Sequence, residues 1–240
     1  MDAQLHELRR ELHEHADPGR TEVLQRFFKT GPGEYGEGDR FLGLRVPQLR
    51  ALARAHRTLD RGSVLELLQS PWHEERLLAL LILVEQYRRG SGEDRETIYR
   101  TYLENTRYIN NWDLVDTSAE HIVGAYLDPA HLDPLDQLAR SASVWERRIA
   151  IMATFRWIRQ GKFGPTLKLA ELLLHDPHDL IHKAVGWMLR EIGKRDRVSE
   201  EVFLRRHYQE MPRTMLRYAL ERFPEPLRQQ YLRGEVDPEA

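Results

Sequence analysis

The 240-residue sequence has no cysteine, which excludes disulfides, thiolate zinc sites, iron–sulfur clusters and cysteine nucleophiles. It also has no long apolar run, because the longest, residues 77–84, is far too short to span a bilayer. The first ten residues include acidic side chains and no apolar stretch, so we expect no secretory signal. These absences predict a soluble, cytoplasmic protein without a membrane partner.

Charge is balanced over the whole chain but unevenly distributed along it. The formal net charge is −2, and 41% of the residues are hydrophobic, which is typical of a globular protein. Residues 145–222 hold 16 Lys and Arg against 10 Asp and Glu. Such a basic segment indicates either a polyanionic partner such as nucleic acid or a solvated, Arg-rich helix surface, and charge alone favours neither.

The order of polar and apolar residues is helical throughout. Leu, Ala, Glu and Arg dominate, and no run of alternating β-branched residues is present. Proline recurs at regular intervals, as at Pro18, Pro71, Pro134, Pro212 and Pro224, where it is tolerated only in the first turn of a helix. We therefore predict about a dozen helices in one all-α domain over residues 1–240.

A repeat gives this helical chain an architecture. A cation precedes an apolar helix body at Arg76, Arg148 and Lys183, and Trp112 lies at the midpoint of the first interval. The four positions are spaced by 36, 36 and 35 residues. This period predicts helical-hairpin repeats of the HEAT size class, stacked into a curved α-solenoid with a concave face.

The same register singles out one carboxylate. One helical turn further on, the equivalent positions are Leu80, Asp116, Met152 and Trp187. Because residues four apart share a helix face, Trp112 and Asp116 are predicted neighbours, and stacking would add Arg148 and Trp187 from adjoining helices. A carboxylate in place of Leu or Met is costly if buried, so we expect Asp116 to face the concave groove.

A carboxylate beside indole rings and a guanidinium suits a cationic ligand next to a phosphate. Trp faces attract cations, and Arg binds phosphate through paired hydrogen bonds. The carboxylate can steady positive charge at a sugar carbon during glycosidic cleavage, or orient the attacking water. The alternative is structural, with Trp112 and Trp187 in the core and Asp116 bridged to Arg148. The residues by themselves leave both interpretations open.

Three motifs resemble one known family. Residues 110–116 (NNWDLVD), 145–150 (WERRIA) and 183–191 (KAVGWMLRE), together with residues 41–47 (FLGLRVP), resemble the AlkD family of HEAT-like-repeat DNA alkylation-repair glycosylases. The resemblance runs from about residue 20 to about residue 225. It implies a monomeric, monofunctional glycosylase that removes cationic N3- or N7-alkylated purines from double-stranded DNA. It also implies that no cofactor or metal is used and that the base is not flipped out.

The resemblance also implies residue roles. Trp112 and Trp187 would contact the deoxyribose and backbone of the lesion nucleotide, Asp116 would stabilise the oxocarbenium-like sugar and orient water, and Arg148 would hold phosphate. The residues expected to bind DNA are Phe27, Lys29, Arg45, Arg147, Arg156, Lys183, Arg190 and Lys194.

The chain departs from the family pattern at three places. Phe27 stands where the family places a Tyr, Arg45 stands where it has a Gln, and residues 31–39 insert a glycine-rich loop with three acids. These departures leave lesion preference and excision itself open. The alternative is a non-catalytic HEAT-like scaffold that binds branched or damaged DNA or a protein partner, and a purely protein-binding solenoid is a third, weaker option.

The remaining patterns favour structural roles. His175, His178 and His182 have a ligand-like spacing, but a helix boundary between them argues against a metal site, and His178 or Asp179 is expected to cap the following helix. The 31–39 loop lacks a Gly-Lys-Ser/Thr sequence, so we expect a flexible surface loop rather than a phosphate-binding one. The residues predicted to pack in the core are Trp72, Trp145 and Trp157.

Overall fold

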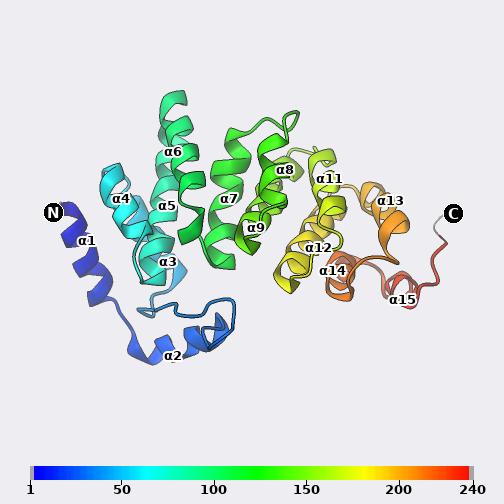
Figure 1. The fold of residues 1–240 in the computed structure, drawn as a ribbon, viewed down its shortest axis with the longest axis horizontal. Coiled ribbons are helices and arrows are strands. Elements are labelled where there is room, and N and C mark those ends of the chain that lie inside the picture. The colour runs from blue at the N-terminus through cyan, green and yellow to red at the C-terminus, as the bar shows by residue number, and fades with distance from the viewer. Residues whose placement is uncertain (1–2, 238–240) are drawn as a thin grey trace. The chain divides into compact units, whose positions relative to one another are not determined.

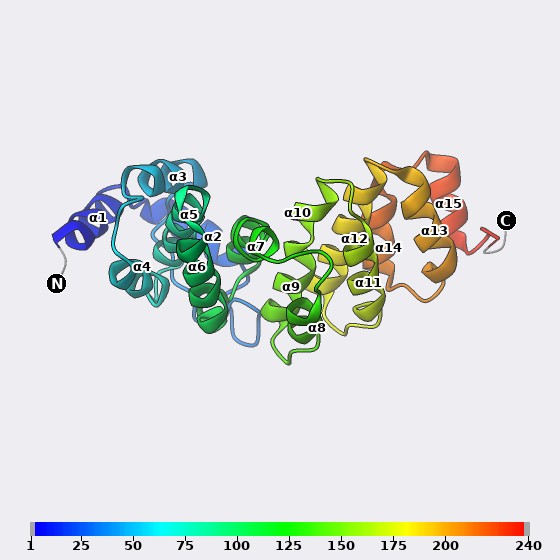
Figure 2. The ribbon, with the colours of Figure 1, turned by 90° about the horizontal axis from the view of Figure 1, so that it is seen from above.

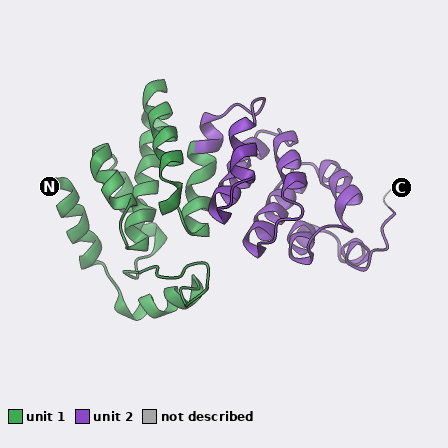
Figure 3. Cartoon of the chain, in the orientation of Figure 1, with its two compact units in different colours: residues 1–122 green, residues 123–240 purple. Residues whose placement is uncertain are grey.

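The computed structural model describes residues 3–237, and within that range every regular element is a helix, apart from an isolated β-bridge between Arg40 and Trp72. The predicted all-α class is therefore confirmed (Figure 1). Contacts divide the chain into two compact units, residues 1–122 (unit 1) and 123–240 (unit 2), and the boundary falls inside helix α7, Trp112–Tyr126 (Figure 3). The single domain expected over residues 1–240 stays a prediction.

Unit 1 is built around its longest helix. Helix α5 (His73–Arg89) packs against α3 (Val46–Ala55) and α4 (Arg61–Leu68), and less extensively against α6 (Gly92–Glu104). Figure 2 shows α5 between α3 and the pair formed by α4 and α6. The remaining elements before α7 are α1 (Ala3–Glu14), α2 (Pro18–Phe27) and the 3-10 turn η1 (Thr106–Tyr108).

Unit 2 stacks its helices in two layers. Helices α9 (Val144–Ala153), α12 (Asp179–Gly193) and α14 (Arg213–Ala219) pack in succession. Helices α8 (Asp133–Ala139), α11 (Gly164–Leu172) and α13 (Arg197–His207) cover them on one side (Figure 2). The shorter elements are α10 (Phe155–Ile158), η2 (Leu220–Arg222) and α15 (Glu225–Arg233). This stacking of helical hairpins is that of an α-solenoid.

Prolines and capping side chains mark several helix ends. Asp17 accepts a hydrogen bond from the Gly19 amide and Pro18 begins α2, while Ser91 and Asp94 form a capping box at the start of α6. The apolar run at residues 77–84 lies in α5 and is buried on every side, because other helices surround α5. No helix among residues 3–237 is long and apolar enough to cross a membrane.

The repeat register predicted for α7 is wrong by about one helical turn. Trp112 is the first residue of α7, whereas Arg148 and Lys183 are the fifth residues of α9 and α12. The three-residue turn η1 lengthens the connection before α7, so the helices do not begin at a constant spacing. Asp116 therefore occupies the place of the two cations, and the acid in the place of the buried Met152 is Glu120, which is itself buried.

A close helix contact supports the segment that carries Trp187. A Cβ on Gly186 would lie 2.4 Å from the backbone oxygen of Met215 and 2.6 Å from the Cβ of Tyr218. Only a residue without a side chain lets α12 and α14 approach this closely. This approach fixes the rotation of α12 about its axis, and with it the direction in which Trp187 points.

A buried carboxyl in unit 2 is expected to make the stability of the protein depend on pH. Glu200 of α13 is 2% exposed, its Oε1 has no hydrogen-bond partner among the described residues, and burial raises its pKa to about 8. A raised folded-state pKa means that ionisation opposes folding, so stability is lost as pH rises from 4.5 towards 8. We expect Glu200→Gln to remove this loss, making the variant more stable than the wild type by roughly 1–3 kcal/mol at pH 8.5 but not at pH 4. Urea unfolding at the two pH values measures the difference in stability between variant and wild type. An equal difference at both pH values would contradict the prediction.

Candidate functional site

An aromatic cluster surrounds the start of α7 in unit 1. The Trp112 ring stacks on Phe28, with 5.3 Å between ring centroids, and meets the edge of Phe27 at 5.8 Å. Phe28 continues the stack to Phe41 at 5.1 Å and packs against His73 at 4.9 Å. Phe28 and Phe41 are buried and Trp112 is half-buried, but Phe27 is 60% exposed. The buried Phe28 therefore holds the Trp112 ring in place from the interior side, and the exposed ring of Phe27 lies beside it.

A buried charge network holds this cluster in place. His73, at the start of α5, lies 2.8 Å from Asp39 through Nδ1 and 2.8 Å from Asp113 through Nε2. Burial lowers the pKa of His73, but the two carboxylates overcome it and raise the pKa to about 9. Arg76 donates to Asp39 at 2.6 Å, and Asn111, immediately before Trp112, donates to Asp39 at 3.4 Å. At neutral pH a charged imidazolium thus links the 31–39 loop to the first turn of α7.

The 31–39 loop is held by its own acids. Glu34 accepts from the Gly31 amide and Glu37 from the Gly33 amide, each at 2.9 Å. The third acid, Asp39, is directed inward to His73 and Arg76, and burial, which favours its neutral form, is outweighed so that its pKa lies below the usual range. Two of the three acids are thereby engaged within the loop, and the third belongs to the interior of unit 1.

The segment after this loop is fixed by a second buried carboxylate. Glu74 accepts the amides of Leu42 and Gly43 at 2.9 and 2.8 Å. Gly43 has φ = +94°, and a Cβ there would lie 2.2 Å from the backbone oxygen of Asp17, so no other residue fits. These contacts give a structural reason for the motif at residues 41–47, because this segment joins α2 and the aromatic residues at its end to α5.

Asp116 lies on the second turn of α7, four residues after Trp112, and both side chains are half-buried. Burial raises the pKa of the Tyr102 hydroxyl, and the neighbouring Asp116 carboxylate raises it further. Tyr102 is itself held by Ser118, at 2.9 Å. Trp112 and Asp116 are thus brought to one face of α7, as predicted from their spacing.

The other two residues of the predicted catalytic set lie in unit 2. Arg148 of α9 is 4% exposed and donates from Nη1 to the backbone oxygen of Leu180 at 2.5 Å. Trp187 of α12 is half-buried, packs against Phe155 at 5.9 Å and donates from Nε1 to Glu191 at 3.2 Å. The assembly of all four side chains into one site stays a prediction.

The residues predicted to bind DNA differ in how available they are. Phe27, Lys29, Arg45, Arg156 and Lys194 are exposed. Lys194 also pairs with Glu191 at 2.5 Å, and Lys183 pairs with Asp179 at 2.7 Å. Arg190 forms an ion pair with Glu221. Arg147 is the least available of these residues, because its guanidinium donates hydrogen bonds to Asp176 and to the backbone oxygens of Ser141 and Ala142. Phosphate binding by these residues stays a prediction.

The family follows from a comparison over most of the chain. The family model described as "DNA alkylation repair enzyme" matches residues 8–223. The chain belongs to this DNA alkylation repair family. The resemblance found in the motifs is therefore confirmed, and a role in DNA repair with DNA as the substrate follows from it.

A solved structure shares the fold of this DNA alkylation repair protein. It is described as a predicted DNA alkylation repair enzyme from Enterococcus faecalis, with a TM-score of 0.65 and 17% sequence identity. The match covers 88% of this chain and 98% of that one. No curated protein matches the chain.

One of the three histidines with ligand-like spacing has a structural role in this repair protein. His178 caps α12 by accepting the Leu180 amide at 3.1 Å, as predicted, and burial lowers its pKa. Among residues 3–237, no group of three or more His, Asp or Glu side chains could hold a metal ion. Of the three tryptophans predicted to be core residues, Trp157 is 2% exposed, and Trp72 and Trp145 are half-buried.

The His73 network is the part of the site that sequence reasoning missed. Its partners come from positions 34 to 72 residues apart in the chain, and no local spacing connects them. The one available signal was the pair of polar residues, Asn111 and Asp113, that flanks Trp112 in the motif. Their side chains turn inward, whereas Trp112 and Asp116 are half-buried and reach the surface of α7.

Proposed function

We propose that this DNA alkylation repair protein is a glycosylase that hydrolyses the N-glycosidic bond of cationic N3- or N7-alkylated purines in duplex DNA, without flipping the base. The observation that carries the proposal is the half-buried Asp116 carboxylate on the same face of α7 as Trp112. The membership in a DNA alkylation repair family supplies the substrate.

The chemistry needs an anion more than an acid. An alkylated purine already carries a positive charge, so when the C1′–N bond breaks, its electron pair neutralises the base, which leaves without being protonated. The positive charge passes to the sugar, where a nearby carboxylate stabilises it. Water then bonds to C1′ and loses a proton, which gives abasic DNA and a neutral free base. Asp116 supplies the anion in this scheme.

The half-buried indole supports the same step. A Trp ring held against Phe28 has one face occupied and leaves its exposed part for the sugar of the lesion nucleotide. Aromatic faces attract positive charge by roughly 0.5–2 kcal/mol, and this attraction grows as charge develops on the sugar. Trp112 therefore adds to transition-state stabilisation from the side opposite its Phe28 contact.

Base release tests the proposal directly. Purified protein is incubated with methylated duplex DNA, and the freed bases are identified by mass spectrometry. We expect release of 3-methyladenine or 7-methylguanine above the spontaneous rate, with no added metal or cofactor. Duplex binding that falls steeply with salt but brings no release at micromolar enzyme would instead support the non-catalytic scaffold.

The exposed Phe27 ring is expected to contribute to DNA binding. Removing it in Phe27→Ala takes away an exposed aromatic surface next to Trp112, and we expect duplexes with an abasic-site analogue to bind about three- to tenfold more weakly. Fluorescence anisotropy measures the change. Val202→Ala, which removes another exposed apolar side chain from α13, serves as the control and should leave affinity unchanged. Equal affinity of Phe27→Ala and wild type would contradict the assignment.

A further inference from the structure

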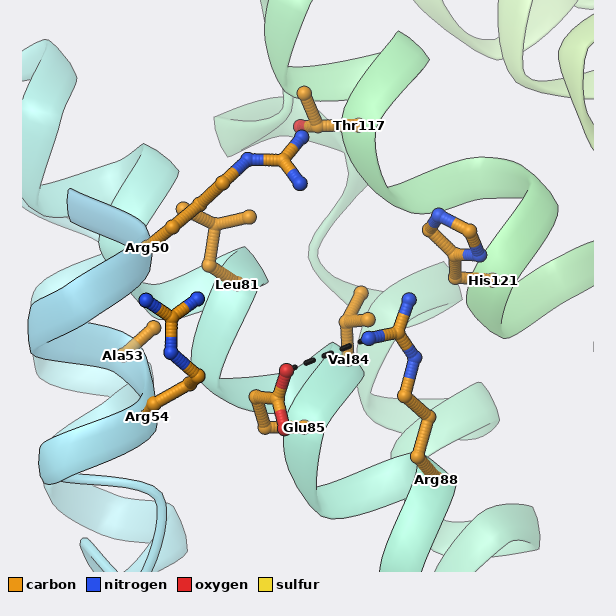
Figure 4. Close-up of a pocket in the computed structure, with 9 residues that line it drawn as sticks. All are labelled: Arg50, Ala53, Arg54, Leu81, Val84, Glu85, Arg88, Thr117 and His121. Carbon is orange, nitrogen blue, oxygen red and sulfur yellow. Dashed lines mark hydrogen bonds and ion pairs between the residues drawn. The ribbon is translucent and has the colours of Figure 1, made fainter. Parts of the chain in front are cut away.

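A pocket in unit 1 gathers three arginines where helices α3, α5 and α7 meet. Arg50 and Arg54 come from α3 and Arg88 from α5, and their guanidinium groups point into the pocket (Figure 4). Thr117 and His121 of α7 close the opposite wall. The pocket volume is about 90 Å³, enough for several water molecules or for one tetrahedral oxyanion.

The positive charge of the pocket is only partly neutralised within the protein. Glu85 is the one carboxylate in its lining, and it lies 3.3 Å from Arg88 and 3.9 Å from Arg89 on the same helix. Among residues 3–237, the guanidinium groups of Arg50 and Arg54 make no ion pair or side-chain hydrogen bond. Two unpaired cations that point into one pocket repel each other unless an anion lies between them.

The lining specifies what kind of anion fits. The buried residues of the lining are Ala53, Leu81 and Val84, and the lining contains no Phe, Tyr or Trp side chain; its one aromatic ring is the His121 imidazole. Planar guanidinium donors match the oxygens of a phosphate group, which they bind in pairs. Arg50, Arg54 and Arg88 are exposed at the rim, so a phosphate that belongs to a polymer can reach them. The pocket therefore selects a phosphate group and leaves its sugar and base outside.

We propose that Arg50, Arg54 and Arg88 form a binding site for one backbone phosphate of duplex DNA. This inference rests on the proposed function only in taking duplex DNA as the ligand. Thr117 in the pocket wall directly follows Asp116 in α7, so the phosphate site and the candidate carboxylate lie on adjoining sectors of the same helix. A strand held at this pocket passes beside Asp116, and the pocket anchors the DNA next to the reacting nucleotide.

Binding of an unmodified duplex tests the site, because that measurement does not depend on base release. In Arg50→Gln/Arg54→Gln we expect affinity at low salt to fall about three- to tenfold. The slope of log K against log salt should become less steep by about 1, which corresponds to one lost phosphate contact. The matched control is Arg57→Gln/Arg61→Gln, which removes the same charge from exposed arginines of unit 1 outside the pocket, and it should keep the wild-type slope.

A second measurement separates a DNA backbone phosphate from a free anion. Thermal unfolding is compared in inorganic phosphate and in chloride at matched ionic strength, for wild type and Arg50→Gln/Arg54→Gln. Phosphate that stabilises the wild type but not the variant, together with the changed DNA slope, supports the proposal. Stabilisation by phosphate with an unchanged DNA slope would overturn it in favour of a small-anion site, and the same slope change in both double variants would overturn it in favour of general surface charge.

The two proposals fail separately. If the wild type releases no base but the salt slope of the pocket variant is less steep by about 1, the glycosylase proposal falls and the phosphate site stands. If the wild type releases bases and the pocket variant binds DNA with the wild-type slope, the phosphate site falls and the glycosylase proposal stands.

Discussion

Replacing Asp116 by Asn is expected to lower the rate of base release from methylated duplex DNA by about 100- to 1000-fold. The substitution keeps the size and shape of the side chain and removes only its charge. The lost interaction is one that strengthens as positive charge moves from the base to the sugar, so it acts on the transition state more than on bound substrate. Single-turnover release from saturating enzyme measures the step itself.

The same substitution, Asp116→Asn, should not weaken the binding of DNA. A carboxylate repels the phosphates of bound DNA, so Asp116→Asn should bind a methylated duplex as tightly as the wild type, or more tightly. Asp128→Asn is the matched control, because it removes an exposed carboxylate from the loop after α7, and it should change neither property. Release by Asp116→Asn within threefold of the wild-type rate would assign the activity to other residues.

The sequence predicted the fold class because helix ends are local. Asp17, Ser91 and Pro224 act within one turn of their own position, so a pattern of a few residues identifies them. The register of α7 was predicted wrongly because it depends on the length of a connection. The turn η1 and the residues around it displace Trp112 by about one turn relative to Arg148, and a constant spacing of 36 residues cannot represent such an insertion.

The candidate site was predictable only in part for a related reason. Trp112 and Asp116 belong to one helix, so their spacing alone places them on one face. The contact of Phe27 with Trp112 joins residues far apart in the chain. The resemblance to known motifs singled out each of the two residues, but neither it nor the periodicity predicted that they touch. The three arginines of the α3–α5–α7 pocket lie in two helices with no motif in common, and only their packing brings them together.

Replacing His73 by Asn is expected to lower the free energy of unfolding by about 3–5 kcal/mol at pH 6. The imidazolium is 2% exposed and lies between Asp39 and Asp113. Its removal leaves Asp39 with Arg76 as its charged partner and takes from Asp113 the cation that neutralises it. Urea unfolding measures the change. His131→Asn is the control, since it removes a histidine from an exposed loop, and it should leave stability unchanged.

The same variant carries a pH signature that distinguishes lost charge from lost packing. The folded-state pKa of His73, about 9, lies above the ordinary value of 6.5, so its stabilisation is complete below pH 6.5 and is lost as pH rises through 9. The difference between wild type and His73→Asn should therefore shrink by about 3 kcal/mol between pH 6 and pH 10. A difference that stays constant over this range would mean that packing against Phe28 and Phe41, and not the imidazolium charge, holds the loop against α7.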